Sequence, residues 1–244
     1  MARKRISESD LLDFRERAEE LSQAVEEKYK KLDAERPAPE PEMGGKWGVL
    51  LIHDPQAGPG QLTAFAGRLK RGGIAAECAD LSSYVPRDQF DKKPLWQRWL
   101  EVAQEAYQRL AARCEKVMVL GTGLSCPLAC VIAEQYPVDS LVTVGGGMKP
   151  VASALLAGGA KKASYQLARL AKNNMFSIVC PILALVPEKC GAYTPQSAQM
   201  YRTHSRSDDV RVEKLPGADV AFLWTGDEKK LFEAVTGFLS GIEA

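Results

Sequence analysis

The sequence contains little of what a metal centre or a histidine-dependent active site requires. Its 244 residues include only two histidines, His53 and His204, so no histidine follows position 204. The cysteines lack the paired spacing of a metal site; they are at positions 78, 114, 126, 130, 180 and 190. Cys126 and Cys130 fall on one face of an expected helix, where we interpret them as small core residues. We expect no metal and no cofactor.

An excess of charge and a long apolar run are also missing. Lys+Arg 32 against Asp+Glu 31 gives a net charge of +1 at pH 7, which indicates neither nucleic acid nor an anionic membrane surface as a partner. No apolar stretch is long enough to span a bilayer, and the N-terminal residues lack the apolar core of a signal peptide. We therefore expect no nucleic-acid partner, no membrane span and a cytoplasmic location.

A separate helix is expected over residues 1–35. Ser7 and Asp10 resemble a capping box, and apolar residues recur at alternating spacings of three and four through residues 7–35. This amphipathic helix either docks on its own domain or forms a short coiled coil, so a homo-oligomer or a protein partner through residues 7–35 is one expected role. Repeated prolines make residues 36–45 a semi-rigid linker.

From residue 46 to residue 244 the pattern predicts one α/β domain. Apolar strand-like runs alternate with helical patterns, which indicates a mostly parallel sheet covered by helices on both faces. The strands are expected near 47–53, 74–79, 116–121, 139–145, 181–187 and 210–214. The helices are expected near 60–71, 94–113, 126–136, 195–203 and 227–241, with a further alanine-rich and basic helical region over 150–176.

The most informative stretch is residues 116–133, where an apolar run breaks into a glycine-rich turn and a helical pattern follows. Gly121 and Ser125 are small residues that flank the centre of this turn by two positions each. That spacing is the steric requirement of a nucleophile elbow, a sharp strand-to-helix turn that presents an attacking side chain. The central residue is Gly123, which has no side chain to attack with.

These motifs resemble the α/β-hydrolase superfamily, in its carboxylesterase and monoacylglycerol-lipase-like branch. Members read roughly V-L-L-I-H-G in the first core strand, G-L-S-M-G-G at the elbow, C-P-x-L-x-x-x-G-x-x-D late in the chain and L-P-x-S-x-H near the end. This sequence has V-L-L-I-H-D over 49–54, the elbow above, C-P-I-L from 180 and L-P-G-A-D over 215–219. The resemblance covers roughly residues 45–242. It implies an α/β-hydrolase-like fold with a short helical cap over about 146–177, although a plain crossover helix is an equal interpretation of that region.

The resemblance also implies that the catalytic positions are degenerate. Read without gaps, the nucleophile, acid and base positions fall on Gly123, Cys190 and Asp219. The family uses two backbone N–H groups as an oxyanion hole, and one of these positions is Pro55, which has no N–H to donate. The other donor, the amide of Leu124, is retained. Losing one such donor alone costs about 2.7–4 kcal/mol of transition-state stabilisation.

We therefore favour a catalytically degenerate hydrolase-fold protein, which binds a small apolar or acyl ligand or a protein partner. The polar lining of a ligand pocket would come from Asp54, Thr122, Glu188, Cys190 and Asp219. One alternative is an active ester hydrolase in which a two-residue shift places Ser125 at the nucleophile position. Another is an oligomerising interaction module that works through the N-terminal helix. Both histidines are interpreted as structural or solvated, since neither is placed to activate a nucleophile.

Overall fold

The computed structural model describes residues 44–84, 92–148, 159–188, 195–215 and 228–243. The chain divides into two compact units, Met1–Glu42 and Met43–Ala244, and the following description concerns the second. The expected N-terminal helix over 7–35 and most of the linker over 36–45 lie outside the described residues, so their roles remain predictions.

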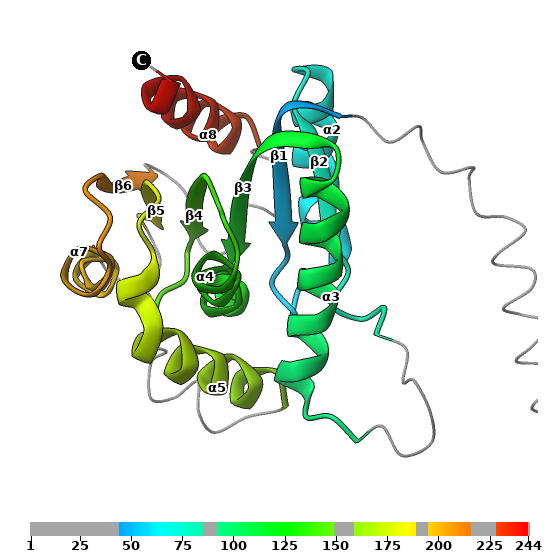
Figure 1. The fold of residues 1–244 in the computed structure, drawn as a ribbon, viewed down its shortest axis with the longest axis vertical. Helices are drawn as coiled ribbons and strands as arrows, with labels where there is room; N and C mark the ends of the chain where they lie inside the picture. Colours follow the sequence, from blue (N-terminus) through cyan, green and yellow to red (C-terminus); the bar gives the residue numbers. More distant parts are fainter. Residues whose placement is uncertain (1–43, 85–91, 149–158, 189–194, 216–227, 244) are drawn as a thin grey trace, which may run out of the picture. The chain divides into compact units, whose positions relative to one another are not determined.

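The second unit is built on one parallel sheet (Figure 1). Its strand order is β2-β1-β3-β4-β5-β6, and all five pairings between neighbours are parallel. Every strand expected from the sequence is confirmed to within two residues at either end. The strands are β1 Gly45–Ile52, β2 Ala75–Ala79, β3 Cys114–Thr122, β4 Ser140–Val144, β5 Ile182–Pro187 and β6 Val210–Leu215.

Helices follow the strands, as the alternating pattern predicts. The α-helices are α2 Thr63–Arg71, α3 Leu95–Ala111, α4 Cys126–Gln135, α5 Gly159–Asn174, α6 Pro195–Ala198, α7 Met200–His204 and α8 Glu228–Glu243. Short 3-10 turns accompany them in the part of the chain that the structure describes: η1 Pro59–Leu62, η2 Gly123–Ser125 and η4 Met175–Ser177. None of the helices in the described ranges combines the length and the apolar character needed to cross a bilayer.

Two of the expected helices differ in detail. The helix expected over 195–203 is divided at Gln199 into α6 and α7, and the helix expected over 60–71 begins with the 3-10 turn η1. A proline at the first position of η1 suits a helix start, because its missing N–H would have no partner there. The region expected to be helical over 150–176 forms α5 and η4 from residue 159 onward, and residues 149–158 lie outside the description.

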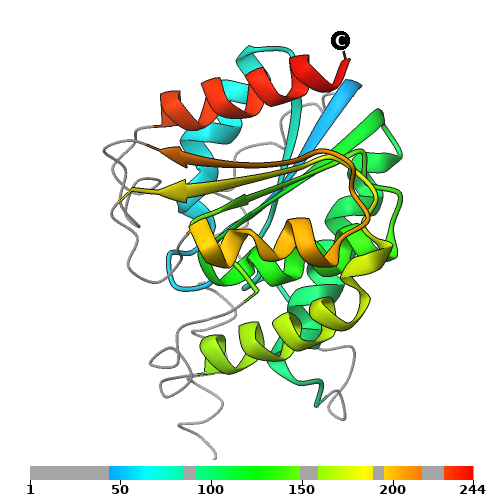
Figure 2. The ribbon, with the colours of Figure 1, turned by 90° about the vertical axis from the view of Figure 1, so that its left-hand side faces the viewer.

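Alternating side chains of the strands divide the core into two layers. On β1, Leu50 and Ile52 pack into the layer that contains α3, α4 and α5, whereas Val49 and Leu51 pack into the layer that contains α2 and α8. Figure 2 shows α8 on one face of the sheet and α4 and α7 on the other. Because both faces are covered, the central strands are almost continuously apolar.

The helix α5 lies against the elbow between β3 and α4. It packs mainly on α4 and also contacts α3 and η2. The Ser164 hydroxyl of α5 donates a 2.7 Å hydrogen bond to the carbonyl oxygen of Leu124 in η2. This helix therefore covers the turn that the sequence singled out.

Candidate functional site

The strand–turn–helix predicted around Gly123 is present. Strand β3 ends at Thr122, the turn η2 follows, and α4 begins at Cys126. Gly123 has a φ of +53°, a left-handed conformation that glycine adopts without strain. A Cβ on Gly121 would lie 2.8 Å from the Cβ of Ala129, so the small residue at this position lets α4 pack closely on the strand.

The space beside Gly123 is filled by the carboxylate of Asp54. A Cβ on Gly123 would overlap Asp54 Oδ2 and lie 2.9 Å from Asp54 Cγ. The N–H of Leu124 donates to Asp54 Oδ2 at 3.1 Å, and the N–H of Gln56 donates to Asp54 Oδ1 at 2.8 Å. The Leu124 amide, which the resemblance marks as an oxyanion donor, thus already binds an anionic group of the protein itself.

Burial is the main influence on the pKa of the Asp54 carboxyl group. Only 8 % of the residue is exposed, and this burial raises the pKa of Asp54 above its ordinary value. The hydrogen bonds from the amides of Gln56 and Leu124 lower the pKa and offset part of that effect. Asp54 therefore holds a proton more tightly in the folded chain than in the unfolded chain.

Replacing this carboxylate gives a test of its contribution to stability. Asp54→Asn is expected to lower the free energy of unfolding by about 1–3 kcal/mol, because the amide NH₂ group would face a backbone N–H donor. The pKa of the Asp54 carboxyl group is higher in the folded chain than in the unfolded chain. Its contribution to the free energy of unfolding is therefore fully present below the pKa of the unfolded chain, and it is lost as the pH rises through the pKa of the folded chain. The stability difference between wild type and Asp54→Asn should therefore shrink as the pH increases.

Urea denaturation of both proteins between pH 4 and pH 8 measures this difference. A difference that stays constant or grows with pH would contradict the raised pKa of Asp54.

A second set of hydrogen bonds fixes the loop that carries Asp54. The side-chain oxygen of Gln61 accepts 2.8 Å and 3.0 Å hydrogen bonds from the Asp54 N–H and the Thr122 hydroxyl. Thr122, expected to line a ligand pocket, is 1 % exposed and also lies 3.3 Å from the carbonyl oxygen of Ile52. Gln61 was missed by sequence reasoning because a glutamine at a helix start has no distinctive spacing; only the fold brings it to the elbow.

Ser125, the alternative nucleophile, is buried and holds the turn together. It has no exposed surface. Its Oγ lies 2.7 Å from the carbonyl oxygen of Ile52 and 2.9 Å from that of Thr122, and these two acceptors compete for the single hydroxyl proton. The same Oγ accepts a 3.0 Å hydrogen bond from the Thr122 N–H. The Ser125 hydroxyl thus both donates to and accepts from backbone groups.

Neither histidine contacts Ser125 in the described hydrogen bonds. His53 is 3 % exposed; its Nδ1 donates to the Asp54 carbonyl at 3.0 Å, and its Nε2 accepts the Leu81 N–H at 3.1 Å. Because both ring nitrogens bind backbone groups, the ring joins the loop after β1 to the loop after β2. His204 ends α7 on the surface, with Nδ1 2.7 Å from the Thr203 hydroxyl.

The nearest thiol to the elbow is equally unsuited to attack. Cys126 is fully buried, and its Sγ lies 3.3 Å from the Gly121 carbonyl oxygen. Burial raises the pKa of the Cys126 thiol well above its ordinary value, which keeps it protonated. Among the described residues, no group of three or more His, Cys, Asp or Glu side chains is arranged to hold a metal ion.

The structure describes two of the other residues singled out by the sequence, Glu188 and Pro55. Glu188 is exposed just after β5, where its N–H donates to the Leu215 carbonyl at 3.2 Å. Cys190 and Asp219 lie outside the described residues, so their roles remain predictions. Pro55 lies in the turn that follows Asp54, whose carbonyl oxygen accepts the N–H groups of Ala57 and Gly58.

Comparison with solved structures identifies the fold. The chain is similar to a structure of the metagenome-derived lipolytic enzymes LipS and LipT, with a TM-score of 0.69, 16% identity, and coverage of 82% of this chain and 96% of that one. The chain has the α/β-hydrolase fold. The monoacylglycerol lipase of Paleococcus ferrophilus matches with a TM-score of 0.62 and 13% identity, over 82% of this chain and 97% of that one. Mouse alpha/beta hydrolase domain-containing protein 10 matches with a TM-score of 0.58 and 14% identity, over 80% of this chain and 90% of that one.

Sequence comparison gives no closer assignment. No protein-family model matches the chain, and no curated protein matches it. At identities of 13–16%, these structural neighbours establish the fold and leave the activity of this α/β-hydrolase-fold protein to be argued from its own residues.

Proposed function

We propose that this chain is a non-hydrolytic α/β-hydrolase-fold protein that acts by binding rather than by catalysis. The observation that carries the proposal is the position of Asp54. Its carboxylate fills the space where a side chain at position 123 would begin, and it accepts the Leu124 N–H that would otherwise stabilise an oxyanion. An ester carbonyl therefore meets neither a nucleophile nor a free oxyanion donor at this turn.

The environment of Ser125 supports the same proposal. A serine nucleophile needs an accessible hydroxyl and a neighbouring base, whereas Ser125 is buried and bound to backbone atoms. The carboxylate of Asp54 is a poor substitute for a histidine base, because both of its oxygens already accept backbone N–H groups and a carboxylate is ordinarily a weaker base than an imidazole.

Labelling with a fluorophosphonate probe tests the proposal. We expect the intact mass of the full chain to be unchanged after incubation, because no serine at the elbow is activated. Hydrolysis of p-nitrophenyl esters of two, four and eight carbons should likewise not exceed the rate without protein. A single adduct that is lost in Ser125→Ala, together with ester turnover, would establish an active hydrolase and overturn the proposal.

A matched stability measurement keeps the Ser125→Ala result interpretable. This variant leaves the Thr122 N–H without its acceptor, so we expect its free energy of unfolding to fall by about 1–3 kcal/mol. Urea denaturation then shows whether a lost adduct reflects a missing nucleophile or an unfolded protein.

The ligand that we propose for the non-catalytic protein is a small apolar or acyl molecule. The lipolytic enzymes among the structural neighbours support this class. Asp54 and Thr122 already make their hydrogen bonds within the protein, which disfavours them as polar lining. Equilibrium binding of fatty acids and monoacylglycerols to the full chain tests the ligand class, and no saturable binding would count against it.

A protein partner or a second copy bound through residues 7–35 remains the other proposed binding role. Removal of residues 1–43, followed by measurement of the mass in solution, tests it. An unchanged monomer would count against oligomerisation through this segment.

A further inference from the structure

Large apolar side chains on the surface lie on α5 or near one of its two ends. Within the described ranges, four such side chains are exposed: Leu95 at 38%, Tyr165 at 39%, Phe176 at 58% and Val179 at 64%. Tyr165 lies in α5, Phe176 lies in η4 directly after it, and Val179 follows η4. Leu95 reaches the start of α5, since its Cδ2 lies 3.6 Å from where a Cβ on Gly159 would be.

The same part of the chain carries positive charge without compensating carboxylates. No aspartate or glutamate occurs between Asp139 and Glu188, whereas this interval contains five lysines and arginines. Four of these belong to α5, namely Lys161, Lys162, Arg169 and Lys172. None of the ion pairs seen among the described residues involves any of the four.

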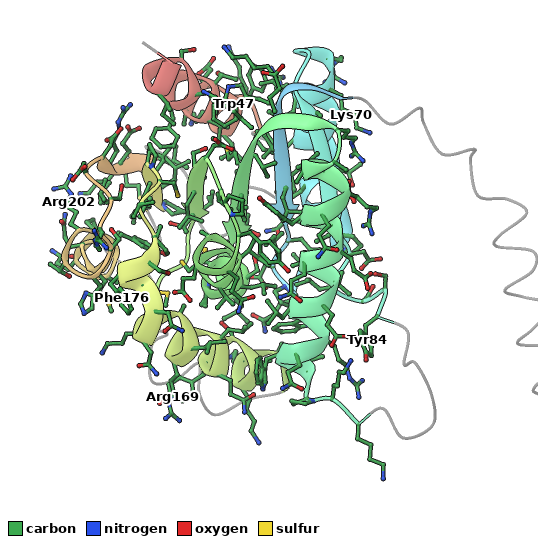
Figure 3. The ribbon with its side chains drawn as sticks, viewed as in Figure 1. Trp47, Lys70, Tyr84, Arg169, Phe176 and Arg202 are labelled. Carbon is green, nitrogen blue, oxygen red and sulfur yellow. The ribbon has the colours of Figure 1, made fainter. Side chains whose placement is uncertain are left out.

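Helical periodicity places the charged and aromatic residues on one stripe. Tyr165, Arg169 and Lys172 follow one another at spacings of four and three, which keeps them on the same side of α5, and Phe176 lies in η4 directly after the helix. The opposite side is buried in the core; it consists of Ala163, Ser164, Leu167, Ala168 and Ala171. Figure 3 shows Arg169 and Phe176 at the outer surface of the molecule, Arg169 below α5 and Phe176 at the end of α5 nearer α7.

The neighbouring segment carries charges of both signs. Arg206, which is exposed, is held beside η4 by a 3.0 Å hydrogen bond from its N–H to the Ile178 carbonyl oxygen. Two carboxylates follow Arg206 in this segment: Asp208, which is exposed, and Asp209, which pairs with Arg211 at 2.7 Å. The local basic surface that the net charge of +1 conceals is therefore the one formed by the four cations of α5.

We propose that the outer face of α5 and η4 docks this protein on the surface of an anionic lipid bilayer. Basic residues attract the anionic headgroups, and exposed aromatic and apolar side chains enter the boundary between headgroups and acyl chains. Tyrosine suits this boundary because its ring is apolar and its hydroxyl is polar. A bilayer accounts for both features, because its headgroups bind the cations while the boundary below them accommodates Phe176 and Val179.

Co-sedimentation with vesicles tests the proposal on the full chain. We expect binding to vesicles of phosphatidylcholine with 30% phosphatidylserine, little binding to pure phosphatidylcholine, and steady weakening between 50 and 300 mM NaCl. Arg169→Glu/Lys172→Glu should weaken binding to the anionic vesicles by about tenfold or more, since each basic residue near the surface contributes measurably. Phe176→Ser should also weaken it while leaving the salt dependence in place.

A matched control separates this face from net charge. Arg71→Glu/Lys214→Glu makes the same total change of charge at exposed positions on α2 and β6, and it should leave vesicle binding nearly unchanged. Equal losses in both double variants, equal binding to both vesicle types, or no binding at all would each overturn the proposal. So would binding of single-stranded RNA or polyglutamate, instead of vesicles, that depends on Arg169 and Lys172. The salt series uses only the wild-type chain, so it remains decisive if a variant does not fold.

Discussion

Gly123→Ser is expected to lower the free energy of unfolding by about 2–4 kcal/mol and to produce no esterase activity. A serine Cβ would overlap the Asp54 carboxylate, which must then move and give up the Leu124 N–H. The left-handed backbone adds a cost of about 1–2 kcal/mol for any residue other than glycine. Urea denaturation measures the stability, and p-nitrophenyl butyrate hydrolysis measures the activity.

Gly73→Ser is the matched control for this prediction. Gly73 has a φ of +77°, but a Cβ there would meet no atom within 4 Å. This variant should therefore show only the conformational cost, about 1–2 kcal/mol. In an Asp54→Gly background the cost of Gly123→Ser should fall to that of Gly73→Ser, because the overlapping carboxylate is gone. Equal costs of Gly123→Ser in both backgrounds would show that Asp54 does not fill the nucleophile space.

Gly146→Ala is expected to destabilise the protein by about 3 kcal/mol. A Cβ on Gly146 would overlap both the carbonyl oxygen of Gly123 and the Sγ of Cys126, and would lie 2.9 Å from the Cys126 Cβ. Neither the turn nor the buried start of α4 can move away without loss of packing, since Cys126 is fully enclosed. Thermal or urea unfolding measures the change.

Gly237→Ala provides the corresponding control for adding a methyl group. A Cβ on Gly237 would meet no atom within 4 Å, and the residue lies inside α8. Alanine is a better helix former than glycine, so the free energy of unfolding of this variant should rise by about 0.5–1 kcal/mol. A Gly146→Ala variant as stable as the wild type would show that the loop after β4 does not press against the elbow.

Much of the fold follows from local patterns that need no tertiary information. Continuous apolar runs such as Val117–Leu120 predict strands covered on both faces, and the amphipathic spacing over Leu95–Ala111 predicts a helix with one buried side. The turn at Gly123 was also predictable, because a strand, a glycine and a proline-initiated helix are each local signals. The break at Gln199 was not predictable in this way, since residues 195–203 have no proline or glycine after the first position.

The sequence by itself determined that no side chain stands at position 123 and that no histidine follows position 204. Those absences are properties of the sequence alone, and they favour the hypothesis of a degenerate site without any knowledge of the geometry. Only the tertiary structure decided what occupies the elbow instead. Asp54 and Leu124 are 70 residues apart in the chain, and parallel pairing of β1 with β3 brings the ends of their strands together. A carboxylate meets a free amide there because the fold, and no local pattern, places them within hydrogen-bonding distance.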